Sequence, residues 1–186
     1  MTLGLSSLSD GELADLSIAG RQQAFAELLR RHREPVYRLI VGNIADPDEA
    51  LDLVQETFVS AHRALRRYDP ERPMRAWLSR IALNKCRDWL RRRKVRRFLG
   101  LAPAAEAPDL PEDRPTQEMQ AADRQELERV AREIAELPSS LREPLVLHVL
   151  ESLSQAETGA ILSISEKAVE TRLRRARIRL SERIGR

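Results

Sequence analysis

Hydrophobic residues recur at helical spacing through the first part of the chain. They stand three and four positions apart between residues 25 and 40, a spacing that places them on one face of a helix. Pro35 interrupts the series and predicts that the helix kinks or restarts there, because proline lacks a backbone N–H. The positions expected to face a core are Phe25, Leu28, Leu29, His32, Val36, Leu39 and Ile40.

A second helix is predicted to begin in the segment Asp46-Pro47-Asp48-Glu49. Asp46 can cap it, Pro47 suits the first helical position, and Glu49 would complete a start similar to a capping box. The residues that this helix is expected to bury are Ala50, Leu51, Val54, Phe58, Ala61 and Leu65.

A loop and a third helix follow in the first domain. Residues 68–73 contain two prolines and no periodicity, a pattern typical of a loop. The third helix is predicted from about Met74 to Arg96. Its expected apolar positions are Trp77, Leu78, Ile81, Ala82 and Trp89.

Residues 98–117 are predicted to form a flexible linker. The segment holds four prolines separated by small and acidic residues, so it can bury little apolar surface. We therefore predict two domains, over 10–97 and 118–186. The second is expected to open with a helix that buries Leu127, Val130, Ile134 and Leu137, to break at Pro138, and to continue with a helix from Leu141 to Leu150.

The end of the chain has the pattern of a helix-turn-helix. Ser154 and Glu157 form an S-x-x-E capping box for a short helix, and Ser165 is the expected cap of the last one. The buried stripe of that last helix is predicted to be Val169, Leu173, Ala176 and Leu180. Aromatic residues make up only 4% of the chain, and together with runs of helix formers this favours an all-α fold of two small helical domains.

Positive charge is concentrated in two places. Residues 1–97 hold 19 Lys or Arg against 13 Asp or Glu, and residues 167–186 hold eight against two, so each segment has a net charge of +6. The chain as a whole has a net charge of only +3. Two separated cationic segments fit contacts with nucleic acid phosphates at two places.

The last helix is the stronger candidate for DNA contact, because the second helix of such a pair fits the major groove. Residues near its start would reach base edges, and arginines further along would hold phosphates. A basic helix that closes a bundle and faces solvent is the alternative. The residues expected on or near its exposed face are Glu166, Lys167, Glu170, Thr171, Arg174 and Arg175. Arg172 and Arg177 are further candidates for phosphate contacts.

Two further helix faces permit more than one interpretation. The basic run 91–97, with Trp77, Asn84, Lys85, Arg87 and Trp89 before it, could stack on unpaired bases and hold phosphates. It could equally be a solvated helix end, and either tryptophan could belong to the core. The acidic face of 48–56 could bind a basic protein surface or be solvated.

Other classes of site are not expected. Cys86 is the only cysteine, the three histidines share no ligand spacing, and no phosphate loop or nucleophile–base pair is present. We expect no metal, no cofactor, no small-molecule ligand and no enzymatic activity. Because no apolar stretch reaches about 20 residues and no secretion signal is visible, we expect a cytoplasmic protein without membrane insertion.

Three segments resemble the conserved regions of bacterial sigma factors. Asp46 to Phe58 is similar to region 2.2, Arg75 to Arg92 to regions 2.3 and 2.4, and Leu153 to Leu180 to region 4.2. With two domains and a short linker, the chain resembles the extracytoplasmic-function (ECF) group of the sigma-70 family. The resemblance covers about residues 10–97 and 118–184.

The resemblance implies a role for each segment in transcription initiation. The acidic helix would dock on the β′ clamp helices of core RNA polymerase, through Asp48, Asp52, Leu53, Val54, Gln55 and Glu56. The loop and helix after it would open the −10 element and hold a flipped base, through Tyr68, Arg75, Trp77, Arg80, Asn84, Lys85, Arg87, Asp88, Arg91 and Arg92. The last helix would read the −35 duplex, through Ser165, Glu166, Lys167, Glu170, Thr171, Arg172, Arg174, Arg175 and Arg177.

The resemblance also implies a contact with the polymerase β flap, an anti-sigma partner that masks both domains, and a role in a stress response. Three positions depart from the family pattern: Thr158 replaces a core aliphatic residue, Gly159 stands where alanine is frequent, and Ser163 replaces a turn glycine. Two other functions stay open, a helix-turn-helix regulator that works without polymerase and an RNA-binding or nucleic-acid-processing enzyme.

Overall fold

The computed structural model describes residues 4–99 and 117–185, and every regular element in these two ranges is a helix. The expected all-α fold is therefore confirmed. Most of the predicted linker, residues 100–116, lies outside the described residues, and the predicted domain boundaries stay predictions. The longer helices are α1 (Asp10–Ile18), α2 (Gln22–Ile44), α3 (Pro47–Ala64), α4 (Met74–Phe98), α5 (Gln117–Ala135), α6 (Ser139–Leu145), α7 (Gln155–Leu162) and α8 (Glu166–Ile184).

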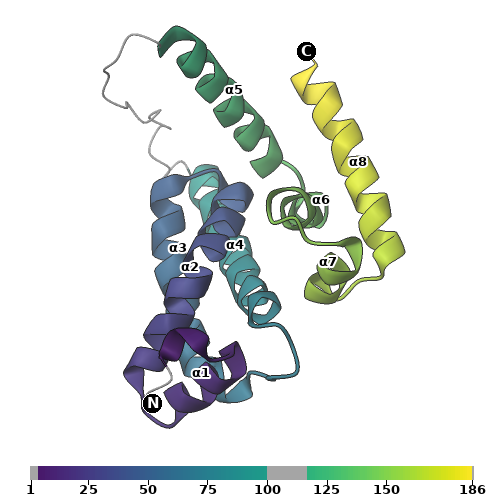
Figure 1. Cartoon of the computed structure of the whole chain (residues 1–186). Helices are drawn as coiled ribbons and strands as arrows, with labels where there is room; N and C mark the ends of the chain where they lie inside the picture. Colours follow the sequence, from purple (N-terminus) through teal and green to yellow (C-terminus); the bar gives the residue numbers. More distant parts are fainter. Residues whose placement is uncertain (1–3, 100–116, 186) are drawn as a thin grey trace.

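Short elements complete the fold. The 3-10 turns η1 (Leu5–Ser7) and η2 (Leu65–Arg67) flank the first helices, and the π-helical turn η3 (Val146–Leu150) extends α6. The predicted single helix from Leu141 to Leu150 is thus divided into an α-helical and a π-helical part. In Figure 1, α1–α4 form one group and α5–α8 lie beside it.

Local capping explains where several helices begin. The Asp46 carboxylate accepts a hydrogen bond from the Glu49 backbone at 3.2 Å, and Pro47 occupies the first turn, as predicted. The Glu49 side chain does not return to the cap, since it accepts a hydrogen bond from Trp89 Nε1 at 2.7 Å. The expected capping box is therefore only half formed, and its acidic member ties α3 to α4.

Helix α2 runs through Pro35 without restarting. It ends at Ile44 and is capped by Ala45, whose φ of 51° lies in the left-handed region. α2 packs against α1, α3 and α4 and so forms the centre of the first group. The expected positions Leu28, Val36, Leu39 and Ile40 are all buried there.

The structure corrects which residues are buried on two of the predicted helices. α3 buries positions spaced three and four apart, namely Ala50, Leu53, Val54, Thr57, Phe58 and Ala61. Leu51 falls between these rows and is 43% exposed, so its predicted burial is wrong. Leu127 on α5 was also expected in the core, and it is 70% exposed.

The second group has its own small core. Leu137, Leu141 and Leu145 pack against Val169, Leu173 and Ala176 of α8, with Leu180 partly buried at the edge. The predicted stripe of the last helix is confirmed. Because this stripe faces α6, the opposite side of α8 is left on the surface.

The two groups also share one continuous core. Val146, Leu147, Leu153 and Ile161 from the second group are buried in the same cluster as the apolar residues of α1–α4. Helix α7 packs on α4, and η3 packs on α2. The structure therefore describes a closed arrangement in which the second group covers part of α2 and α4.

Candidate nucleic-acid and polymerase interfaces

The α7–α8 pair has the geometry of a capped helix-turn-helix. The Ser154 hydroxyl accepts from the Glu157 backbone at 3.1 Å, and the Glu157 carboxylate accepts from the Ser154 backbone at 2.8 Å. Ser165 caps α8 by accepting from the Ala168 backbone at 3.2 Å. Both predicted caps are confirmed.

The turn between these helices is tight at two positions. Ser163 adopts a φ of 56°, a left-handed conformation that costs about 1–2 kcal/mol for a residue other than glycine. At Gly159 an added Cβ would lie 2.7 Å from the Ile164 carbonyl oxygen. Alanine is therefore excluded at position 159, because the turn brings backbone atoms up against that residue.

Thr158 is fully buried, and its hydroxyl has no hydrogen-bond partner among the described residues. Thr57 is equally buried, but its hydroxyl donates to the Leu53 carbonyl at 2.7 Å. This contrast provides a matched pair for measuring the cost of the unpaired group.

The Thr158→Val variant is expected to raise the free energy of unfolding by about 1 kcal/mol, because it removes a desolvated hydroxyl and keeps the side-chain shape. Thr57→Val is expected to lower it by about 1 kcal/mol, since a satisfied hydrogen bond is lost. Urea unfolding followed by circular dichroism measures both changes. Equal shifts in the same direction would contradict the assignment.

The exposed side of α8 carries the residues proposed for DNA contact. Glu166, Lys167 and Glu170 are exposed on its first turns, as are Arg174, Arg175 and Arg177 further along. Thr171 and Arg172 are half-buried, and the Thr171 hydroxyl donates to the Lys167 carbonyl at 2.9 Å. A short ion pair from Lys167 lowers the pKa of Glu170. This surface offers both hydrogen-bonding groups and free cations to a groove.

Only some of the residues predicted to bind polymerase lie on the exposed surface of α3. Asp48, Asp52, Gln55 and Glu56 are exposed, and Glu56 lies 3.2 Å from Lys85 of α4. Leu53 is 2% exposed and Val54 is 4% exposed. A direct contact of Leu53 with another protein does not fit this burial; Leu53 instead fixes α3 to the core.

Helix α4 holds its two tryptophans differently. Trp89 is 4% exposed and donates to Glu49, so it belongs to the core, which leaves the expected base-stacking role to Trp77. Trp77 is half-buried, and its ring centre lies 5.3 Å from that of Tyr68. Asn84, Asp88, Arg91 and Arg92 are exposed, with Asp88 and Arg91 paired at 2.6 Å.

Three arginines of the predicted −10 site contact the second helix group. Arg75 Nη2 donates to Glu151 Oε2 at 2.6 Å, and Arg87 Nε donates to Glu143 Oε1 at 2.7 Å. Arg80 Nε donates to the Ile161 carbonyl at 3.0 Å. The hydrogen bonds that Arg87 donates to Glu143 raise the pKa of Arg87, so this guanidinium stays charged.

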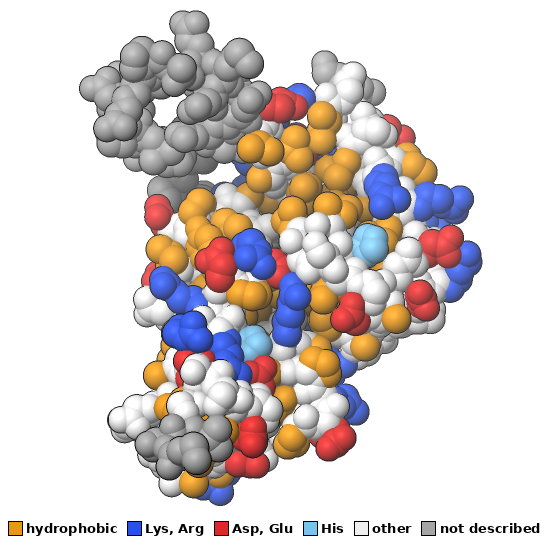
Figure 2. All heavy atoms as spheres, in the orientation of Figure 1, with side chains coloured by type: hydrophobic (Ala, Val, Ile, Leu, Met, Phe, Trp, Pro, Cys, Tyr) orange, Lys and Arg blue, Asp and Glu red, His pale blue; other side chains and the backbone are white. Residues whose placement is uncertain are grey.

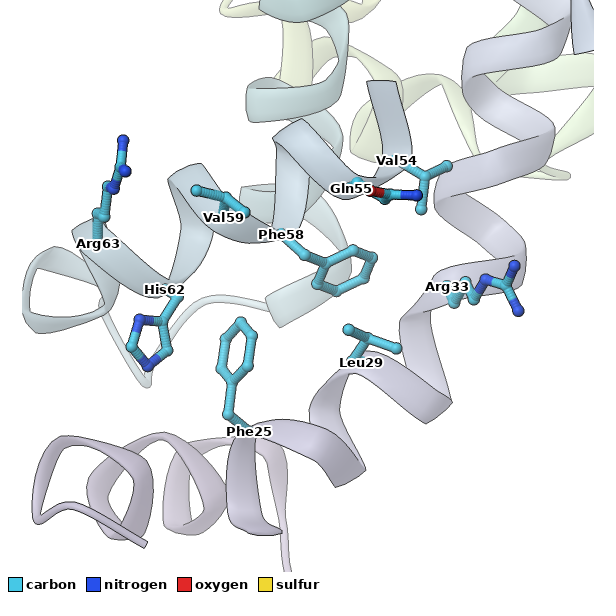
Figure 3. A pocket seen from close by; sticks show the side chains of 9 residues that line it. All are labelled: Phe25, Leu29, Arg33, Val54, Gln55, Phe58, Val59, His62 and Arg63. Atoms are coloured by element: carbon cyan, nitrogen blue, oxygen red, sulfur yellow. The ribbon is translucent and has the colours of Figure 1, made fainter. Parts of the chain in front are cut away.

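An apolar groove between α2 and α3 was not predicted. Figure 3 shows Phe25 and Leu29 of α2 facing Phe58 and Val59 of α3, and the centres of the Phe25 and His62 rings are 4.7 Å apart. Its lining residues are Phe25, Leu29, Arg33, Val54, Gln55, Phe58, Val59, His62 and Arg63. The sequence signal was Val59, an apolar residue off the buried stripe that is 49% exposed.

Lysine and arginine side chains do not form a single patch on the face shown in Figure 2, where they are interspersed with acidic and hydrophobic side chains. Among the described residues, no cluster of three or more His, Cys, Asp or Glu could hold a metal ion. Burial raises the pKa of the Cys86 thiol to about 12. No helix in the described ranges has the length and apolarity to cross a membrane.

Comparisons with known proteins agree with this architecture. Residues 28–96 match the family model of sigma-70 region 2, and residues 127–180 match that of sigma-70 region 4. The RNA polymerase sigma factor CnrH of Cupriavidus metallidurans is 42% identical over 93% of both chains. The ECF sigma factor SigM of Mycobacterium tuberculosis is 32% identical over 98% of this chain and 88% of its own.

A solved structure gives the same result. The structure of CnrH in complex with the cytosolic domain of CnrY aligns with a TM-score of 0.69 at 36% identity, over 95% of this chain and 97% of that one. Both regions expected from the resemblance are thus matched, in the same order along the chain. The chain belongs to the sigma-70 family of RNA polymerase sigma factors, within its extracytoplasmic-function group.

Proposed function

We propose that this ECF sigma factor directs core RNA polymerase to promoters through three surfaces. The exposed face of α3 binds the polymerase β′ clamp helices, α4 with the loop before it opens the −10 element, and α8 reads the −35 duplex. The observation that carries the proposal is the capped α7–α8 pair, whose buried stripe leaves a basic helix face free, on the same chain as an exposed acidic helix.

The polymerase contact is assigned to the exposed members of the acidic face. Asp48, Asp52, Gln55 and Glu56 have free surface, whereas Val54 lines the neighbouring apolar groove. Carboxylates on an exposed rim steer a basic partner into register. The combination of a charged rim and an apolar groove fits a protein partner better than a nucleic acid, which acidic residues repel.

The −10 contact is assigned to α4 and its preceding loop. Tyr68, Trp77 and Asn84 supply rings and an amide for an unpaired base, and Arg75, Arg80, Lys85, Arg87, Arg91 and Arg92 supply cations for the strand. Asp88, which pairs with Arg91, orients that guanidinium. An aromatic and basic combination of this kind suits single-stranded DNA.

Promoter-specific run-off transcription tests the proposal. Core polymerase with the chain is expected to give defined transcripts, and core alone is not. A promoter for this assay comes from sequencing the transcripts induced by overexpression. Operator binding with no effect on core polymerase would instead support a polymerase-independent regulator.

Arg175→Ala is expected to weaken binding of the holoenzyme to a promoter duplex, because one phosphate contact is lost. The logarithm of the binding constant should then fall less steeply with the logarithm of salt concentration, by about 1 in the slope. Fluorescence anisotropy at several salt concentrations measures both effects. Arg30→Ala is the control, since it removes an equal charge from an exposed arginine on α2. An equal slope for the two variants would contradict a phosphate contact at Arg175.

We further propose that a protein partner holds the free chain inactive. CnrH was solved in complex with the cytosolic domain of CnrY, and the apolar groove of Figure 3 is open on the described surface of this chain. A factor that works on core polymerase and promoter DNA acts in the cytoplasm. Pull-down with the groove variant Val59→Asp, compared with the unaltered chain, tests for such a partner.

A further inference from the structure

Two buried carboxylates of the second helix group occupy arginines of the first. The Glu151 side chain is 2% exposed; it receives hydrogen bonds from Arg75 at 2.6 Å and from Arg38 at 3.1 Å. The Glu143 side chain is 6% exposed and binds the Arg87 guanidinium through both oxygens, at 2.7 and 2.5 Å. Arg80 donates to the carbonyls of Ala160 and Ile161 at the end of α7.

These contacts use the donors that a nucleic acid strand would need. A guanidinium presents a planar fork that fits a carboxylate or a phosphate in the same bidentate way. Arg75, Arg80 and Arg87 all lie on α4, and all three are engaged by α6, α7 and the residues between them. A DNA phosphate can accept hydrogen bonds from these N–H groups only after the glutamates and carbonyls have left.

An apolar seam closes the same contact. A Cβ added to Gly42 would lie 2.7 Å from Leu150 Cδ1 and 3.0 Å from Val146 Cγ1, so any larger residue must displace these two side chains. Leu147 and Val146 are at most 1% exposed against the first group. Arg142 reaches across to Asn43 at 3.3 Å. The apolar contacts of the seam are independent of charge, and they help to hold the two glutamates against their arginines.

We propose that the free chain rests in a closed, self-inhibited state in which Glu143 and Glu151 take the place of DNA phosphates on Arg87 and Arg75. This inference rests on the proposed −10 role of α4. Opening moves α5–α8 away as a unit and frees the arginines. Because the closed state competes with DNA within one chain, the apparent affinity for a single strand falls by the fraction of molecules that are open.

Fluorescence anisotropy of the full chain with a labelled single-stranded oligothymidine tests the inference. The Glu143→Gln, Glu151→Gln pair is expected to bind about tenfold more tightly than the unaltered chain. Glu126→Gln, Glu182→Gln is the matched control, because it removes the same charge at exposed sites and leaves the contact intact. Equal gains for both pairs would overturn the proposal.

A second variant opens the seam without changing any charge. Gly42→Leu places a side chain where even a Cβ collides with Leu150, so it is expected to raise the affinity for the oligothymidine and to increase the radius of gyration in small-angle X-ray scattering. Circular dichroism checks that helix content is kept. Adding Arg75→Ala and Arg87→Ala to this variant is expected to abolish the gain. No gain from Gly42→Leu despite an expanded chain would overturn the proposal.

The outcome is separable from that of the proposed function. If the unaltered chain directs promoter-specific transcription while the opened variants gain no affinity, the closed-state proposal fails alone. If no promoter-specific transcript forms, the proposed function fails, and scattering still reports whether the free chain is closed.

Discussion

Core RNA polymerase supplied with the Asp52→Lys, Glu56→Lys variant is expected to give about 100-fold less promoter-specific transcript than with the unaltered chain. Both carboxylates are exposed on α3, so the substitution changes the surface and leaves the core of the helix in place. The two new lysines would lie against a basic partner surface, and such a contact between like charges costs several kcal/mol at an interface. A multi-round run-off assay at fixed core concentration measures the loss.

The design needs a control for net charge and for folding. Asp15→Lys, Glu126→Lys makes the same change in charge at exposed positions of α1 and α5, away from the α3 face. This control is expected to keep nearly full transcription. Co-purification with core polymerase should fail for the α3 variant only. An unimpaired α3 variant, or an equally impaired control, would show that this face does not bind polymerase.

Local sequence signals predicted the parts of the fold that depend on local physics. The caps at Asp46, Ser154 and Ser165 each satisfy orphan N–H groups within three residues, so short motifs were sufficient to place them. The stripe of α8 was also correct, because four apolar residues repeat over several turns. These features predict the helix-turn-helix and its exposed basic face from the sequence alone.

The wrong residue was predicted to be buried where neighbouring apolar residues could form more than one hydrophobic stripe. On α3, Leu51, Leu53 and Val54 are all apolar, and periodicity alone does not show which of them faces solvent. Packing against α2 and α4 decides in favour of Leu53 and Val54. The same ambiguity affected the two tryptophans of α4, since burial of Trp89 depends on Glu49, which lies 40 residues away.

The contact between the two helix groups could not have been predicted from the sequence. Its ion pairs join residues 56, 76 and 113 positions apart, as in Arg87–Glu143, Arg75–Glu151 and Arg38–Glu151. A glutamate in an exposed position and one that is buried and paired look the same in a single sequence. The predicted DNA-binding arginines were therefore identified without the carboxylates that cover them.

Arg142 has a comparable, hidden role in the second group, and its removal is expected to have the largest effect on stability. It is 5% exposed, and its Nη1 donates to the carbonyls of Ala135 and Leu137 at 2.7 and 2.8 Å. These carbonyls lie at the end of α5 and just beyond it, where a helix leaves its last C=O groups without internal partners. One buried guanidinium thus closes a helix end and also reaches Asn43 of α2.

Arg142→Met is expected to lower the free energy of unfolding by about 3 kcal/mol. Methionine fills much of the space but donates no hydrogen bond, so two buried carbonyls and the Asn43 oxygen lose their partner at about 1–3 kcal/mol for each group left unsatisfied. Burial lowers the pKa of Arg142, because a charged group is unfavourable away from water. Removing the charge therefore recovers part of the free energy that its burial costs. Urea unfolding monitored by circular dichroism measures the change.

Arg179→Met on the exposed side of α8 is the matched control, and we expect it to change the free energy of unfolding by less than about 0.5 kcal/mol. Arg142→Lys separates charge from geometry. Lysine keeps the cation, but it cannot place a planar fork against two carbonyls and an amide together, so most of the stability should still be lost. Full recovery with lysine would mean that charge, and not the capping of α5, is what position 142 supplies.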